Sequence, residues 1–77
     1  MNDRNKILIQ FLFVAEEYNI EIIKINFRNK TSILDEAEFT FKNEHDKFII
    51  KLSYEKNNVY DVNSVGHYIK YKLRELI

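Results

Sequence analysis

Two histidines, His45 and His67, are the residues of this chain best suited to acid–base or metal chemistry. A catalytic histidine works beside an activated nucleophile or an orienting carboxylate. The chain has no cysteine, and neither histidine stands at a motif spacing from a serine or a carboxylate. The single glycine, Gly66, argues against phosphate-cradling loops, which need several glycines for close backbone approach. We therefore expect no enzymatic activity, no small-molecule substrate and no cofactor.

Metal binding has equally little support in the sequence. Zinc sites use closely spaced Cys or His ligands, whereas the two histidines here are isolated from each other. The segment Glu44-His45-Asp46 is typical of a polar turn, and the acidic residues around it lack the alternation and central glycine of a calcium loop. The sequence therefore predicts no metal site.

The sequence has more residues suited to binding a partner than to catalysis or metal binding. The first group lies on a C-terminal segment with helical periodicity. Four of its residues, at the spacing i, i+3, i+4 and i+7, share the helix face opposite the apolar stripe, and Tyr68 lies beside them. These four are His67, Lys70, Tyr71 and Arg74. Basic groups with an interleaved aromatic ring can bind phosphates and stack bases, or pair with an acidic protein surface. The alternative is a solvated helix end whose cations interact favourably with the helix dipole.

The second candidate surface is apolar. Ile9 and Phe13 are one helical turn apart and project from the side of an N-terminal helix that faces away from its main stripe. They either pack sideways against a second helix or form an exposed apolar strip, which is typical of a protein interface. Self-association through this strip is the simplest form of such an interface.

The helix that carries Ile9 and Phe13 is predicted over residues 4–18, with Asp3 as its N-cap and Asn19 at its end. A strand over residues 7–14 is the alternative, because a short apolar run is ambiguous by periodicity alone. The run is too short to span a bilayer, which needs about 20 residues, and no small-residue cleavage site follows it. We expect a buried helix in a protein that is not secreted. Its stripe consists of Ile7, Leu8, Phe11, Leu12, Val14, Ala15 and Tyr18.

After this helix the apolar period changes to two, which is typical of half-buried strands. Three such runs are separated by a loop at residues 29–35 and by a four-residue turn at residues 43–46. Their core-facing positions are Ile23, Ile25 and Phe27, then Ala37, Phe39 and Phe41, then Phe48, Ile50, Leu52 and Tyr54.

The last helix carries the basic and aromatic face. Asp61, Asn63 and Ser64 are its candidate N-caps. Its apolar stripe follows the 3.6-residue period and consists of Val62, Val65, Ile69, Leu73 and Leu76.

The layering follows from this α-β-β-β-α order. Each strand has one apolar and one polar side, so one sheet face needs covering, and two helices about 10 Å wide cover three strands about 4.8 Å apart. We expect one α+β domain over residues 1–77, with two layers and both helices packed on one face of a three-stranded antiparallel sheet. The opposite sheet face is left to solvent or to a partner. It carries Lys24, Asn26, Arg28, Glu38, Thr40, Lys42, Lys47, Ile49, Lys51 and Ser53.

The order of elements resembles the double-stranded-RNA-binding domain over nearly the whole chain. That resemblance implies RNA contacts through the first helix, the loop between the first two strands and the start of the second helix. The family's Gly-Pro-x-His-like loop is replaced here by residues 29–35, and its Lys-Lys-x-Ala-Lys cluster by Asn63-Ser64-Val65-Gly66-His67. The resemblance is therefore one of topology, and no RNA contacts carry over from it.

The balance of charges and the amino-acid composition indicate which kinds of partner the chain could bind. Twelve Lys and Arg balance twelve Asp and Glu, so no strong overall field attracts nucleic acid or anionic lipid. Abundant Ile, Lys and Asn indicate an AT-rich coding sequence, as in a low-GC bacterium or its phages. We expect a small cytoplasmic protein-binding module, such as a phage or mobile-element regulator or inhibitor, acting through self-association or another protein. Nucleic-acid binding through the C-terminal helix is the alternative, and no membrane association is expected.

Overall fold

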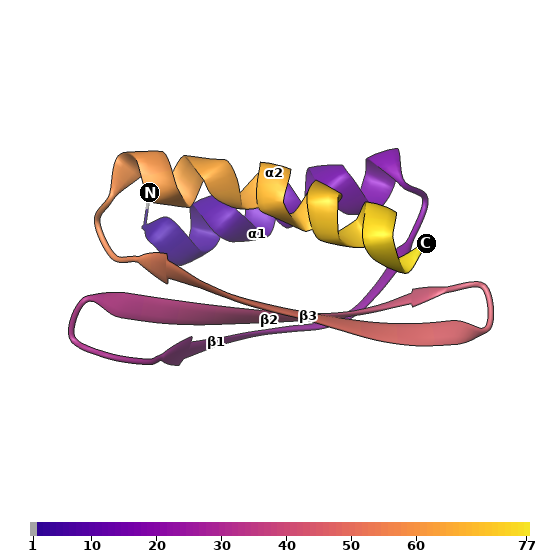
Figure 1. Ribbon diagram of the computed structural model, residues 1–77, viewed down its shortest axis with the longest axis horizontal. Coiled ribbons are helices and arrows are strands. Elements are labelled where there is room, and N and C mark those ends of the chain that lie inside the picture. The colour runs from indigo at the N-terminus through magenta and orange to yellow at the C-terminus, as the bar shows by residue number, and fades with distance from the viewer. Residues whose placement is uncertain (1) are drawn as a thin grey trace.

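The computed structural model describes residues 2–77 and confirms the expected architecture. Helix α1 (Asp3–Glu17) precedes strands β1 (Glu21–Asn29), β2 (Leu34–Asn43) and β3 (Asp46–Glu55), and helix α2 (Val59–Leu76) follows them. The strands form one antiparallel sheet in the order β1-β2-β3. Both helices lie on the same side of this sheet, with α1 in contact with β1 and α2 in contact with β3 (Figure 1).

The core lies between the two layers. The apolar sides of β2 and β3 face the helices as predicted, and Ala37, Phe39 and Phe41 are fully buried. Phe11 of α1 stacks on Phe39 with 4.1 Å between the ring centroids. The stripe of α2 packs on the same core through Val62, Val65, Ile69 and Leu73, whereas Leu76, predicted to belong to it, is largely exposed at the helix end.

The predicted N-caps are wrong by one residue for α1 and by three or more for α2. The side chain of Asn2, rather than Asp3, caps α1 and accepts a hydrogen bond from the Asn5 N–H at 2.8 Å. Asn58 caps α2 and accepts from the Asp61 N–H at 3.1 Å, so α2 begins before the predicted caps. Its first turn exposes Val59 and therefore carries no apolar periodicity that could reveal it.

Asn19 ends α1 as predicted. It adopts a left-handed conformation (φ 54°), its N–H donates to the Glu16 carbonyl, and the N–H of Ile20 donates to the Ala15 carbonyl. These two bonds form a Schellman motif.

The predicted core-facing orientation of Ile23 in β1 is wrong. Ile22 pairs with Phe41 and Lys24 pairs with Thr40, so Ile23 is an extra residue in a β-bulge. The bulge turns Ile22 toward the helices and leaves Ile23 exposed, in contrast to the predicted alternation.

Both connections between strands are shorter than predicted. Asn43 pairs with Asp46, which leaves a two-residue turn of Glu44 and His45 in place of four residues. Likewise β2 already begins at Leu34, so the first loop spans only residues 30–33.

Candidate protein-binding surfaces

The outer side of α1 carries three exposed apolar side chains. Phe13 is 68% exposed, Leu12 48% and Ile9 38%. Ile9 and Phe13 project outward as the spacing predicted, whereas Leu12 does not belong to the buried stripe in which the sequence placed it. We call these three residues the α1 strip.

The buried side of α1 determines where the α1 strip points. Ile7, Phe11, Val14 and Ala15 are all buried against the core. Successive residues of a helix are turned by about 100° around its axis, so these four positions lie within about 100° of one another and form one narrow side of the helix. Ile9, Leu12 and Phe13 therefore face outward, whereas Gln10 faces α2.

Gln10 fixes α1 against α2. Its Nε2 donates to the Val62 carbonyl at 2.8 Å, and its Oε1 accepts from the Gly66 N–H at 2.8 Å. In a regular α-helix the Gly66 N–H donates to the Val62 carbonyl, so the Gln10 amide contacts both groups of one helical hydrogen bond. A Cβ at Gly66 would lie 2.9 Å from Gln10 Oε1. The close approach explains the only glycine of the chain, which sits inside a helix where glycine is unfavourable.

An ionic cluster fixes the start of α1 on the sheet, with Asp35 and Tyr54 buried and the Arg4 side chain 46% exposed. The Arg4 guanidinium donates to both carboxylate oxygens of Asp35 at 2.8 Å, and the Tyr54 hydroxyl donates to Asp35 Oδ2 at 2.5 Å. Arg4 also lies over the Phe27 ring, 5.5 Å from its centroid. The prediction of a loop at Asp35 is wrong, because Asp35 lies in β2 on the core-facing side and is 96% buried.

This cluster changes the acidity of its members. The hydrogen bonds from Arg4 lower the pKa of Asp35, and this effect outweighs the increase caused by burial. Burial, together with the neighbouring carboxylate, raises the pKa of the Tyr54 hydroxyl. Asp35 is therefore ionised and Tyr54 protonated at neutral pH.

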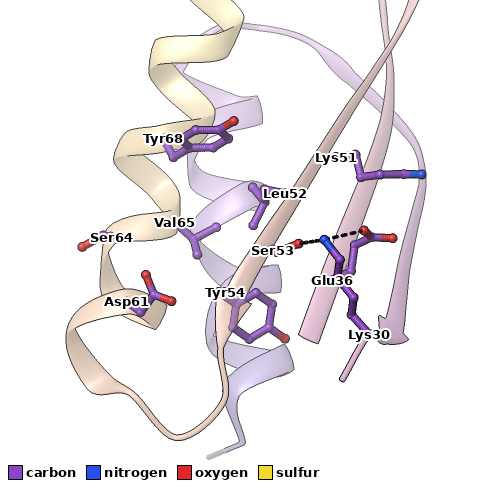
Figure 2. A pocket seen from close by; sticks show the side chains of 10 residues that line it. All are labelled: Lys30, Glu36, Lys51, Leu52, Ser53, Tyr54, Asp61, Ser64, Val65 and Tyr68. Carbon is purple, nitrogen blue, oxygen red and sulfur yellow. Dashed lines mark hydrogen bonds and ion pairs between the residues drawn. The ribbon is translucent and has the colours of Figure 1, made fainter. Parts of the chain in front are cut away.

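The predicted basic face of α2 is divided in the structure. Lys70 forms an ion pair with Glu17 at 3.0 Å, and Arg74 Nε donates to the Tyr18 hydroxyl at 3.2 Å, so both cations reach the C-terminal end of α1. His67 and Tyr71 are exposed. Tyr68 lies toward β3, where it lines a hollow with Leu52 (Figure 2).

The two predicted surfaces meet between the helices. Phe13 lines a shallow hollow of about 190 Å³ together with Gln10, His67 and Lys70. The α1 strip and part of the α2 face are therefore neighbours on one side of the molecule.

The described residues offer little for other kinds of site. Residues 2–77 contain no group of three or more His, Asp or Glu side chains that could hold a metal ion. No helix within the same residues is both long and apolar enough to cross a membrane. Comparison of the chain with models of protein families, with curated proteins and with solved structures finds no match.

Proposed function

We propose that this chain is a non-catalytic module that binds another protein through the α1 strip, and that a second copy of the chain is the simplest partner. The exposure of Phe13 together with that of Ile9 and Leu12 supports this proposal most strongly. Burial of one such aromatic side chain in an interface contributes about 1.5–3 kcal/mol.

The anchoring of α1 adds to this argument. Gln10 holds the helix to α2, and Asp35 holds its first turn to the sheet. A surface whose backbone is already ordered loses little conformational entropy when it binds. Two copies of α1 related by a two-fold axis would bring the same strip into contact with itself.

Nucleic-acid binding through α2 receives less support from the geometry. Lys70 and Arg74, which would contact phosphates, are engaged by Glu17 and Tyr18 of α1. The α1 strip has no such internal partner for Phe13, whose side chain is mostly exposed. We therefore favour a protein partner.

Sedimentation velocity of the wild type and of Phe13→Asp and Ile9→Asp tests the proposal. We expect a wild-type dimer and monomeric variants, because a charge in an apolar interface is costly. Tyr60→Asp is the matched control, since Tyr60 is 86% exposed on α2 and should not affect association. Circular dichroism should show all variants folded, because substitutions at exposed positions change stability by only about 0.5 kcal/mol.

A monomeric wild type would exclude self-association. Binding of a different protein to the α1 strip is then tested with the wild type and the same variants as baits in a host lysate. A genuine partner is captured by the wild type and by Tyr60→Asp and is lost with Phe13→Asp. Equal capture by all three baits would contradict binding through the α1 strip.

A further inference from the structure

The outer edge of β3 has unpaired backbone groups beside α2. β3 is an edge strand, because β2 is its only neighbour in the sheet. The Glu55 N–H points away from β2, since it donates to the Asp61 carboxylate of α2. Backbone groups of a strand alternate in direction with a period of two. The amides of Lys51 and Ser53 therefore also point to the free edge.

Two hollows follow this edge between β3 and α2. The first, of about 460 Å³, is lined by Leu52, Val65 and Tyr68 among others, and the second, of about 280 Å³, by Ile50 and Leu76 among others. Tyr68 and Lys51 line both hollows, so the two form one groove. We call it the β3–α2 groove.

The two sides of the edge differ in chemistry. On the helix side, the hollow is lined by the partly exposed ring of Tyr68 beside the buried Leu52 and Val65, and Asp61 and Ser64 lie toward the start of α2 (Figure 2). On the open side of the sheet lie the ammonium groups of Lys51 and Lys30, and Lys30 Nζ donates to Ser53 Oγ at 3.0 Å. Lys47 lies on the same open side of β3 and takes part in none of the ion pairs among residues 2–77.

Three carboxylates lie on the open face near the groove: Glu55 at the end of β3, and two others that are already engaged by cations. Glu36 accepts from Arg28 and lies 4.0 Å from Lys30, and Glu38 lies 3.7 Å from Lys51. Both belong to β2, one strand further from the edge. A strand added beside β3 would therefore meet Lys47 and Lys51 on its open side, with Glu55 only at the end of β3, and the ring of Tyr68 on its helix side.

We propose that the β3–α2 groove binds an extended peptide segment of a partner protein as a fourth strand of the sheet. Side chains of such a strand alternate between the two faces, so the matching segment alternates apolar and acidic residues. Its apolar side chains lie over Tyr68 and Leu52, and its carboxylates pair with Lys51 and Lys47. This surface is separate from the α1 strip, so either proposal can fail without the other.

The test uses a fluorescein-labelled eight-residue peptide in which valine alternates with glutamate. We expect saturable binding by fluorescence anisotropy, with shifts of the Lys51 and Ser53 backbone amides in NMR spectra. A peptide that alternates valine with lysine should bind about tenfold more weakly, because its ammonium groups face those of β3. Equal binding of the two peptides, absence of binding, or shifts confined to α1 would overturn the proposal.

Backbone pairing is tested with the protein intact by two peptides that are N-methylated at alternate amides, one at odd and one at even positions. Only one of the two sets of amides faces β3, so one peptide should lose binding and the other should keep it. If both bind as tightly as the unmodified peptide, no strand is added and the proposal is wrong.

Variants of the protein complete the test. Ser53→Pro removes an outward amide of an edge strand and should weaken binding about fivefold relative to Ser53→Ala, which keeps that amide and loses the same hydroxyl. Tyr68→Ala should also weaken binding, and Tyr71→Ala, on the same helix but outside the groove, should not. Concentration-dependent amide shifts along β3 in the chain alone would mean that a second copy occupies the edge and would contradict the peptide assignment.

Discussion

Individual side chains tie together segments that are far apart in this sequence. Gln10 contacts the backbone of α2 at positions more than 50 residues away, and Asp35 connects the first turn of α1 to β3 through Arg4 and Tyr54. Both residues are polar and interrupt or end an apolar pattern. For that reason the sequence pattern predicts a loop at Asp35 and no contact for Gln10.

The contact between Gln10 and Gly66 predicts an unusual response to mutation. Gly→Ala inside a helix ordinarily stabilises by about 1 kcal/mol. In this chain Gly66→Ala should give no gain or a small loss of stability, because the new Cβ displaces the Gln10 amide from its two hydrogen bonds.

A double-mutant cycle with Gln10→Ala isolates this effect. In the Gln10→Ala background, Gly66→Ala should recover a stabilisation of about 1 kcal/mol, measured by urea unfolding. The same effect of Gly66→Ala in both backgrounds would show that the Gln10 amide does not determine the need for glycine.

The Arg4–Asp35–Tyr54 cluster predicts how stability depends on pH. Because the folded state lowers the pKa of Asp35, the unfolded state binds more protons below about pH 5. The stabilisation from Asp35 is therefore complete above its ordinary pKa of about 4 and is lost as the pH falls through the lower pKa of the folded state.

Asp35→Asn tests this dependence. The variant should be less stable than the wild type at pH 7 by about 1–3 kcal/mol, since Arg4 and Tyr54 lose a charged acceptor. Its free energy of unfolding should fall less steeply between pH 5 and pH 2 (about the range in which carboxylates titrate). Some slope will remain, because Arg28 also lowers the pKa of Glu36. An unchanged acid slope would contradict the role given to Asp35.

Three connections between the helices and strands place a residue other than glycine in the left-handed region of backbone conformation. The α1 end uses Asn19, a residue that tolerates the left-handed region, and the loop before α2 does the same with Asn57. The β2–β3 turn instead places Glu44 there, with φ 56°. A non-glycine residue in this conformation costs about 1–2 kcal/mol.

Glu44→Gly should therefore stabilise the protein by about 0.5–1 kcal/mol, after allowance for the greater freedom of glycine in the unfolded chain. His45→Gly is the matched control in the same turn, because His45 does not have a positive φ and should gain nothing. Thermal unfolding followed by circular dichroism measures both variants, and a larger gain from His45→Gly would refute the explanation.

For the whole molecule, the two helices and three strands leave several surfaces uncovered. The helices run in the same direction side by side, since Asp3 contacts Asn57 and Glu17 contacts Lys70 (Figure 1). With α1 over β1 and α2 over β3, the outer side of α1 and the free edge of β3 lie on different parts of the surface. The peptide test and the dimer test therefore use separate sets of variants.

The sequence predicts the order of the elements, most of their core-facing positions and the outward direction of Ile9 and Phe13. It could do so because helices and strands repeat with different periods, and each period is visible within a single segment. The bulge at Ile23 escaped this reasoning, since one inserted residue changes the side on which its neighbours lie without altering composition.

Which faces meet depends on contacts between elements that are distant in the sequence. The contact between Gln10 and Gly66, the burial of Asp35 and the β3–α2 groove each join residues from separate elements. Such contacts depend on the packing of the two helices on the sheet, which no local pattern records. The two proposed binding surfaces differ in the same way: the α1 strip belongs to one helix and could be predicted, whereas the groove exists only after α2 has packed beside β3.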